Sequence, residues 1–124
     1  MNRISTTLLI TSTLLFTACD YPDNPQEVAL KMCEATKELD LSGMRKYATK
    51  AYGVNLKRKM KSFESALDRD DPKAIELKQR YSQISCSDLV LKEGMGRILH
   101  VQSTSDVINK MRLQQVNQEW KVIQ

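Results

Sequence analysis

The sequence predicts an α+β domain in which helices come first and a four-strand antiparallel meander follows. Apolar residues recur at helical spacing from residue 25 to residue 81, and then at alternate positions towards the end of the chain. Three turn-forming stretches, "EGMG", "TSD" and "NQE", divide the second half into strand-sized pieces. Helices followed by a run of strands are typical of the α+β class, and 124 residues leave room for one small domain.

The first helix is expected from about Pro25 to Leu39. Asn24 can cap this helix, Pro25 suits the first helical position, and Glu27 stands at the third, as in a capping box. The apolar positions that repeat at helical spacing are Val28, Met32, Ala35 and Leu39.

Three further helical segments are expected before residue 82. Ser42 can cap a short helix that carries Met44, Tyr47 and Ala48, and Gly53 is expected to break the helical run. A third helix places apolar residues on one face at steps of four, three and four. Asp71 can cap a fourth helix that opens at Pro72. The apolar face of the third helix consists of Leu56, Met60, Phe63 and Leu67.

The second half changes to an alternating pattern, which predicts strands. Leu99 and Val101 alternate with polar neighbours, as in a half-buried strand. We expect four strands, within residues Ile84–Lys92, Arg97–Ser103, Val107–Val116 and Trp120–Ile123.

The N-terminus has the layout of a secretory signal. Arg3 precedes an apolar stretch from Leu8 to Phe16, and the small residues Thr17 and Ala18 follow. A membrane-crossing helix needs about 20 predominantly apolar residues, and this stretch is shorter and contains several threonines. An uncleaved anchor and ordinary signal-peptidase cleavage nearby stay open as alternatives.

The sequence "LFTAC" resembles the bacterial lipobox, with Phe16 where leucine is usual. The resemblance implies that Cys19 is acylated, that the peptide is cut before it, and that two or three acyl chains such as palmitate then hold the chain in the membrane. Asp20 resembles the signal that keeps some bacterial lipoproteins in the inner membrane. The expected organisation is a signal peptide over residues 1–18, an acylated cysteine and tether over 19–24, and one domain over 25–124.

Cys33 and Cys86 form an even pair, which in an oxidising compartment favours a disulfide over two buried free thiols. Two cysteines and the single histidine, His100, offer too few ligands for a metal site, so no metal is expected. The net charge of +4 is mild and accompanies no aromatic-plus-basic motif, so no nucleic acid partner is expected either.

The stretches "NPQEVALKMCEATKELDLSGMRKY" and "EWKV" resemble a family of small bacterial lipoproteins of unknown function. That family is assigned to the nuclear transport factor two-like, or cystatin-like, superfamily. The resemblance implies helices packed into the hollow of a curved antiparallel sheet, often as a cone with a pocket. It implies no reaction, because this superfamily includes enzymes, binding proteins and structural modules.

Residues that could line such a pocket are few, and each also suits a packed core. The candidates are Tyr47, Met60, Phe63, His100, Met111 and Trp120. Methionines and aromatic residues fill cores as readily as they line apolar ligand sites. The basic run "LKRKMK" over Leu56–Lys61 indicates a solvated helix face or a contact with anionic lipid headgroups.

We therefore expect a non-enzymatic, lipid-anchored module on the periplasmic side of the bacterial envelope, which binds a ligand or an envelope protein. No catalytic residue and no cofactor are expected, and the oligomeric state stays open. One alternative is a small enzyme that uses Asp88 and His100 in the cone. Another is a lipoprotein that excludes a phage, a plasmid or a toxin by protein contact.

Overall fold

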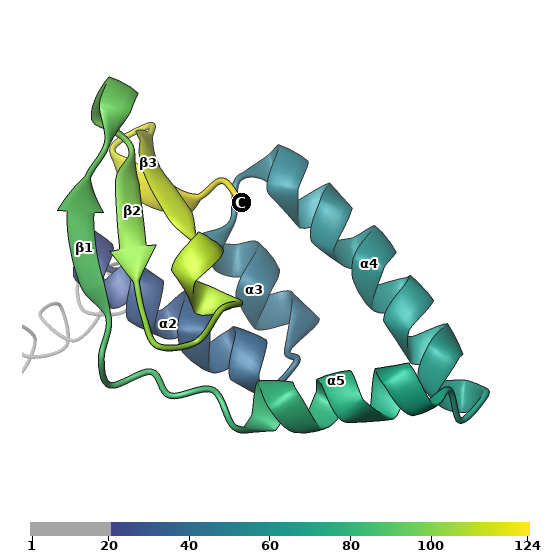
Figure 1. The fold of residues 1–124 in the computed structure, drawn as a ribbon. Helices are drawn as coiled ribbons and strands as arrows, with labels where there is room; N and C mark the ends of the chain where they lie inside the picture. The colour runs from purple at the N-terminus through teal and green to yellow at the C-terminus, as the bar shows by residue number, and fades with distance from the viewer. Residues whose placement is uncertain (1–20) are drawn as a thin grey trace, which may run out of the picture.

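The computed structural model describes residues 21–124 and confirms the α+β class, with the helices before the sheet (Figure 1). The expected signal peptide, Cys19 and Asp20 lie outside the described residues. The helices are α2 (Pro25–Lys37), α3 (Leu41–Tyr47), α4 (Lys50–Asp68) and α5 (Pro72–Ser82). The strands are β1 (Val90–Glu93), β2 (Leu99–Gln102), β3 (Arg112–Val116) and β4 (Glu119–Val122), with short 3-10 helices η1 (Met95–Arg97) and η2 (Ile108–Lys110) between them.

Two of the helix starts are confirmed in detail. The side chain of Asn24 accepts a hydrogen bond from the backbone N–H of Glu27 at 2.8 Å, so α2 begins as expected. Asp71 accepts from the backbone N–H of Lys73 at 2.9 Å and caps α5. Each cap satisfies a backbone donor that the first turn of a helix leaves free.

The expected bounds of the second helix are wrong. Asp40, not Ser42, caps α3, because its carboxylate accepts from the backbone N–H of Gly43 at 3.1 Å. Gly53 does not break the helical run either, since it is a buried residue inside α4. Thr49 starts α4 by accepting from the backbone N–H of Tyr52 at 3.3 Å, and the weak helix propensity of one glycine does not outweigh that cap.

The strands pair as an antiparallel meander in the order β1-β2-β3-β4. The third expected strand is wrong over Val107–Met111, where the chain forms η2 and its flanking residues before β3 begins at Arg112. The backbone N–H of Asn109 bonds to the carbonyl of Ser105 at 2.8 Å, so the chain turns there. The turn buries Ile108, which is 1% exposed, in the core.

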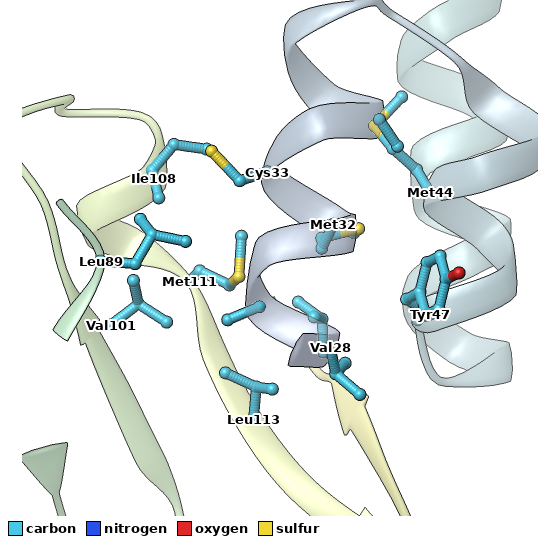
Figure 2. Packing of buried hydrophobic residues seen from close by; sticks show 14 of the residues in the cluster. Val28, Met32, Cys33, Met44, Tyr47, Leu89, Val101, Ile108, Met111 and Leu113 are labelled. Carbon is cyan, nitrogen blue, oxygen red and sulfur yellow. The ribbon is translucent and has the colours of Figure 1, made fainter. Parts of the chain in front are cut away.

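Helix α2 forms the centre of the molecule. Figure 2 shows Val28 and Cys33 of α2 between Leu113 and Val101 of the sheet on one side and Met44 of α3 on the other. Val28, Cys33 and Leu113 are 0% exposed. Since α2 covers this face of the sheet, the inward side chains of the strands pack on a helix.

A disulfide joins Cys33 of α2 to Cys86 of the segment before β1, with 5.9 Å between the two Cα atoms, as predicted. The bridge spans 53 residues of sequence and thereby closes the loop that contains α3, α4 and α5. In the chain-entropy account, a loop of this length stabilises the fold by roughly 4 kcal/mol.

The pair of helices α4 and α5 extends away from the rest of the molecule, and in Figure 1 the two helices form two sides of a triangle. Helix α4 packs mainly on α3 and α5. Gly53 is its one buried residue, although the helix is 19 residues long. Among residues 21–124, no helix has the length and the apolar character that crossing a membrane requires.

Candidate functional site

A cleft of about 980 Å³ lies between the α4–α5 pair and the body formed by α2, α3 and the sheet. Ligand sites in proteins commonly measure about 300–1,000 Å³, so this cleft is at the upper end of that range. We call it the α4 cleft. Its apolar lining includes Leu56, Met60 and Phe63 of α4, Leu77 and Tyr81 of α5, and Ile108 and Met111 from the body.

The apolar stripe of α4 faces this cleft because of its helical spacing. Tyr52, Leu56, Met60 and Phe63 follow one another at steps of four, four and three, and all four are half-buried lining residues. Val54 lies on the outward side of the same helix and is 57% exposed. The stripe therefore lines the cleft along α4, where Tyr52, Leu56 and Met60 also pack against the buried core and Phe63 does not.

Three of the six predicted pocket residues line the α4 cleft: Met60, Phe63 and Met111. The cleft is not the hollow of the sheet in which we expected the pocket. Helix α2 fills that face of the sheet with Val28 and Met32, which are 0% and 2% exposed. The long helical middle of the sequence forms a separate hollow beside the sheet instead.

Tyr47 and Trp120, which were also predicted for a pocket, do not line the α4 cleft. Tyr47 is a buried core residue of α3, and its ring lies 5.6 Å from that of Tyr21, centroid to centroid. The backbone carbonyl of Trp120 accepts a hydrogen bond from the hydroxyl of Tyr21 at 2.6 Å. The Trp120 side chain is half-buried against the core, which is the alternative role that the sequence left open.

His100 does not line the cleft either. It stands on β2 between Leu99 and Val101, whose side chains pack on the core, so alternation along the strand places His100 on the opposite face. Its ring lies against Gly94, where an added Cβ would come within 2.4 Å of the imidazole.

The register separates Asp88 from His100. His100 pairs with Lys92, four residues along the chain from Asp88. The Asp88 carboxylate instead accepts hydrogen bonds from the Thr104 hydroxyl at 2.7 Å and the Thr104 backbone N–H at 3.1 Å. These bonds lower the pKa of Asp88 below its ordinary value, the Thr104 hydroxyl contributing most. Asp88 thus joins the end of β2 to the start of β1 and forms no acid–base pair with the histidine.

Cationic side chains border the α4 cleft; one of them, Lys59, belongs to the basic run Leu56–Lys61 noted in the sequence, and the other two were missed. Lys59 of α4, Lys110 of η2 and Arg112 of β3 are exposed lining residues. No aspartate or glutamate of residues 21–124 lines the cleft. Lys59 is 51 residues before Lys110 in the sequence, so no local pattern indicates that it borders the same cleft as Lys110 and Arg112.

Two tyrosines of the cleft were also missed. Burial raises the pKa of Tyr52, with the nearby Tyr81 as the second cause, so the Tyr52 phenol stays neutral at ordinary pH. Neither hydroxyl has a hydrogen-bond partner among residues 21–124. The apolar stripe of α4, continued one step of four back from Leu56, would have found Tyr52. Tyr81 lies on another helix, so its place in the cleft cannot be predicted without knowing how α5 packs beside α4.

Within residues 21–124, no group of three or more histidine, cysteine, aspartate or glutamate side chains is placed to hold a metal ion. No family model, curated protein or solved structure matches the chain. The resemblance to the cystatin-like lipoproteins therefore stays a prediction.

Proposed function

We propose that this chain is a non-enzymatic, lipid-anchored protein of the bacterial envelope that binds a ligand or partner in the α4 cleft on the periplasmic side. The observation that carries the proposal is a cleft of about 980 Å³ whose apolar lining is only partly packed on the core. Phe63 and Leu77 line the cleft and do not pack against the buried core. An occupant that removes this apolar surface from water gains about 25 cal/mol of binding free energy for each Å².

The lipid anchor in this proposal rests on the sequence "LFTAC" around Cys19. The folded domain begins at Tyr21, two residues after Cys19. A domain attached so closely to acyl chains stays near the membrane surface, and inner-membrane retention through Asp20 is part of the same proposal.

Binding is favoured over catalysis by what surrounds the two residues of the enzyme alternative. Asp88 is engaged by Thr104 and Ser103. His100 is packed beside Gly94 on the other face of the sheet from α2. Neither residue lines the α4 cleft, so a substrate in that cleft would meet neither.

The test is crosslinking in cells with a photoreactive amino acid in place of Phe63, inside the cleft. The matched control carries the same amino acid in place of Val54, on the outward side of α4. We expect a discrete crosslinked product, lipid or protein, from position 63 and none of the same mass from position 54. Equal crosslinking from both positions, or none from position 63, would contradict the proposal.

A further inference from the structure

We propose that the occupant of the α4 cleft is an amphipathic anion with one long hydrocarbon chain, such as a fatty acid or a lysophospholipid. This inference rests on the proposed function, because it names the class of ligand that the same cleft takes. Three features carry it: the elongated apolar lining, the cations at the border, and the free tyrosine hydroxyls.

The apolar lining is long. On α4 it extends from Ala51 to Phe63, which at 1.5 Å per residue is about 18 Å. Tyr52, Leu56 and Met60 lie along this line, and Leu77 of α5 and Met111 of the body lie across from it. An extended hydrocarbon chain covers such a line with apolar contact, whereas a compact ring covers only part of it.

The charges at the border select the other end of the ligand. Lys59, Lys110 and Arg112 are exposed, so a headgroup beside them stays in contact with water and its desolvation costs little. The Arg112 guanidinium donates to the side-chain amide oxygen of Gln124 at 3.1 and 3.3 Å. Lys59 and Lys110 form no ion pair among residues 21–124, so they supply most of the attraction for an anion. With no acidic lining residue within 21–124 to oppose them, these side chains favour an anionic headgroup.

The tyrosine hydroxyls give the cleft neutral donors as well. Tyr52 and Tyr81 lie on different helices, α4 and α5, and both line the cleft. No described residue occupies either hydroxyl, so both can donate to a carboxylate, an ester or a phosphate oxygen. An apolar site with a few free polar groups is the usual composition of a small-molecule site.

Other occupants match the cleft less well. A second copy presenting the same cleft would bring Lys59 and Lys110 against their equivalents, which like charges disfavour. The apolar stretch Leu8–Phe16 of this chain contains no acidic residue to meet the cations. A partner helix with its side chains is about 10 Å wide. The cleft volume of about 980 Å³ would therefore hold only about two turns of such a helix.

The test uses the full chain in nanodiscs of neutral phosphatidylcholine, with a palmitate analogue that carries a photoactivatable diazirine in its chain. We expect mass spectrometry of the labelled protein to place the adducts on cleft residues such as Leu56, Met60 and Phe63. Unlabelled palmitate and lysophosphatidylglycerol are the competitors, and whichever competes better identifies the headgroup as a carboxylate or a phosphate. Hexadecyltrimethylammonium has a chain of the same length and a positive headgroup, so we expect it not to compete.

Charge reversal supplies a second, independent variant. Lys59 and Lys110 are exposed, so the double variant Lys59→Glu with Lys110→Glu leaves the core intact, and we expect it to lower labelling of the cleft about tenfold. The matched control, Lys57→Glu with Lys61→Glu, reverses two charges on α4 outside the cleft lining and should leave labelling unchanged.

Adducts spread equally over the outward side of α4, equal competition by the cationic amphiphile, or equal loss in both double variants would each overturn the inference. A protein crosslinked through position 63 in cells, without capture of the palmitate analogue, would also overturn it. That last result would leave the proposed function standing, so the two failures are distinguishable.

Discussion

The hydroxyl of Tyr21 donates a hydrogen bond of 2.6 Å to the backbone carbonyl of Trp120, across 99 residues of sequence. The Tyr21 ring also packs near that of Tyr47 and lies under the ammonium of Lys121, 4.4 Å from the centroid. Burial raises the pKa of Tyr21 to about 12, with Glu119 and Tyr47 as lesser causes, so the phenol remains a donor. The first described residue is therefore held on β4 and α3.

This attachment makes the tether to the proposed anchor very short. Cys19 lies two residues before Tyr21 in the sequence. If Cys19 is acylated, metabolic labelling with a fatty-acid analogue marks the wild type and not Cys19→Ser. Equal labelling of both proteins would remove the lipid anchor from the account.

The variant Tyr21→Phe measures how much the hydrogen bond from Tyr21 to Trp120 stabilises the fold. Loss of the hydrogen bond to Trp120 should lower the free energy of unfolding by about 1 kcal/mol in urea denaturation. Tyr81→Phe is the matched control, because the hydroxyl of Tyr81 bonds to none of residues 21–124 and its removal should cost much less. Equal losses in the two variants would show that the hydrogen bond does not hold the N-terminus.

The disulfide should make a larger contribution to stability. Protein prepared without reductant should contain neither Cys33 nor Cys86 as a free thiol when it is alkylated and weighed. Cys86→Ser should reduce the free energy of unfolding by roughly 4 kcal/mol, because the loop between the two positions is then no longer closed in the unfolded chain. Two freely alkylated thiols in the wild type would rule out the bridge.

Asp88 should make stability depend on pH in the acid range. Its pKa is lowered in the folded state, so its contribution is present above the ordinary aspartate pKa and is lost as the pH falls from about 4 towards the lowered value. Thr104→Val removes the largest cause of the shift and should raise the pKa of Asp88 in an NMR titration. The hydroxyl of Ser105 does not bond to Asp88, so the control variant Ser105→Ala should leave the pKa of Asp88 unchanged. An Asp88 pKa that does not respond to Thr104→Val would contradict this assignment.

Local signals in the sequence predicted much of the fold. The caps at Asn24 and Asp71, the apolar spacing of α2 and the alternation around Leu99 and Val101 all depend on neighbouring residues. The errors occurred where a contact between distant parts of the chain determines the secondary structure. Val107–Lys110 reads as part of a strand, but burial of Ile108 and a turn that bonds Asn109 to Ser105 make it a 3-10 helix.

The candidate site was predicted in part for the same reason. The stripe containing Met60 and Phe63 was visible in the sequence, since it depends on the period of one helix. Its surroundings were not visible. The cleft exists because α2 fills the face of the sheet and α4 stands away from it, and Lys110 and Arg112 come to its border from the other side. The positions of these helices and side chains around the cleft can be seen only in the packed structure.

Occupancy of the α4 cleft in cells is the central claim, and methionine oxidation measures it with an internal control. Met60 lines the cleft, whereas Met95 is 90% exposed in η1. We predict that a brief pulse of oxidant in living cells oxidises Met95 and spares Met60, and that Met60 becomes reactive once the purified chain is stripped of ligand. Met60 oxidised equally before and after stripping would contradict the account, because the cleft would then be empty where the protein works.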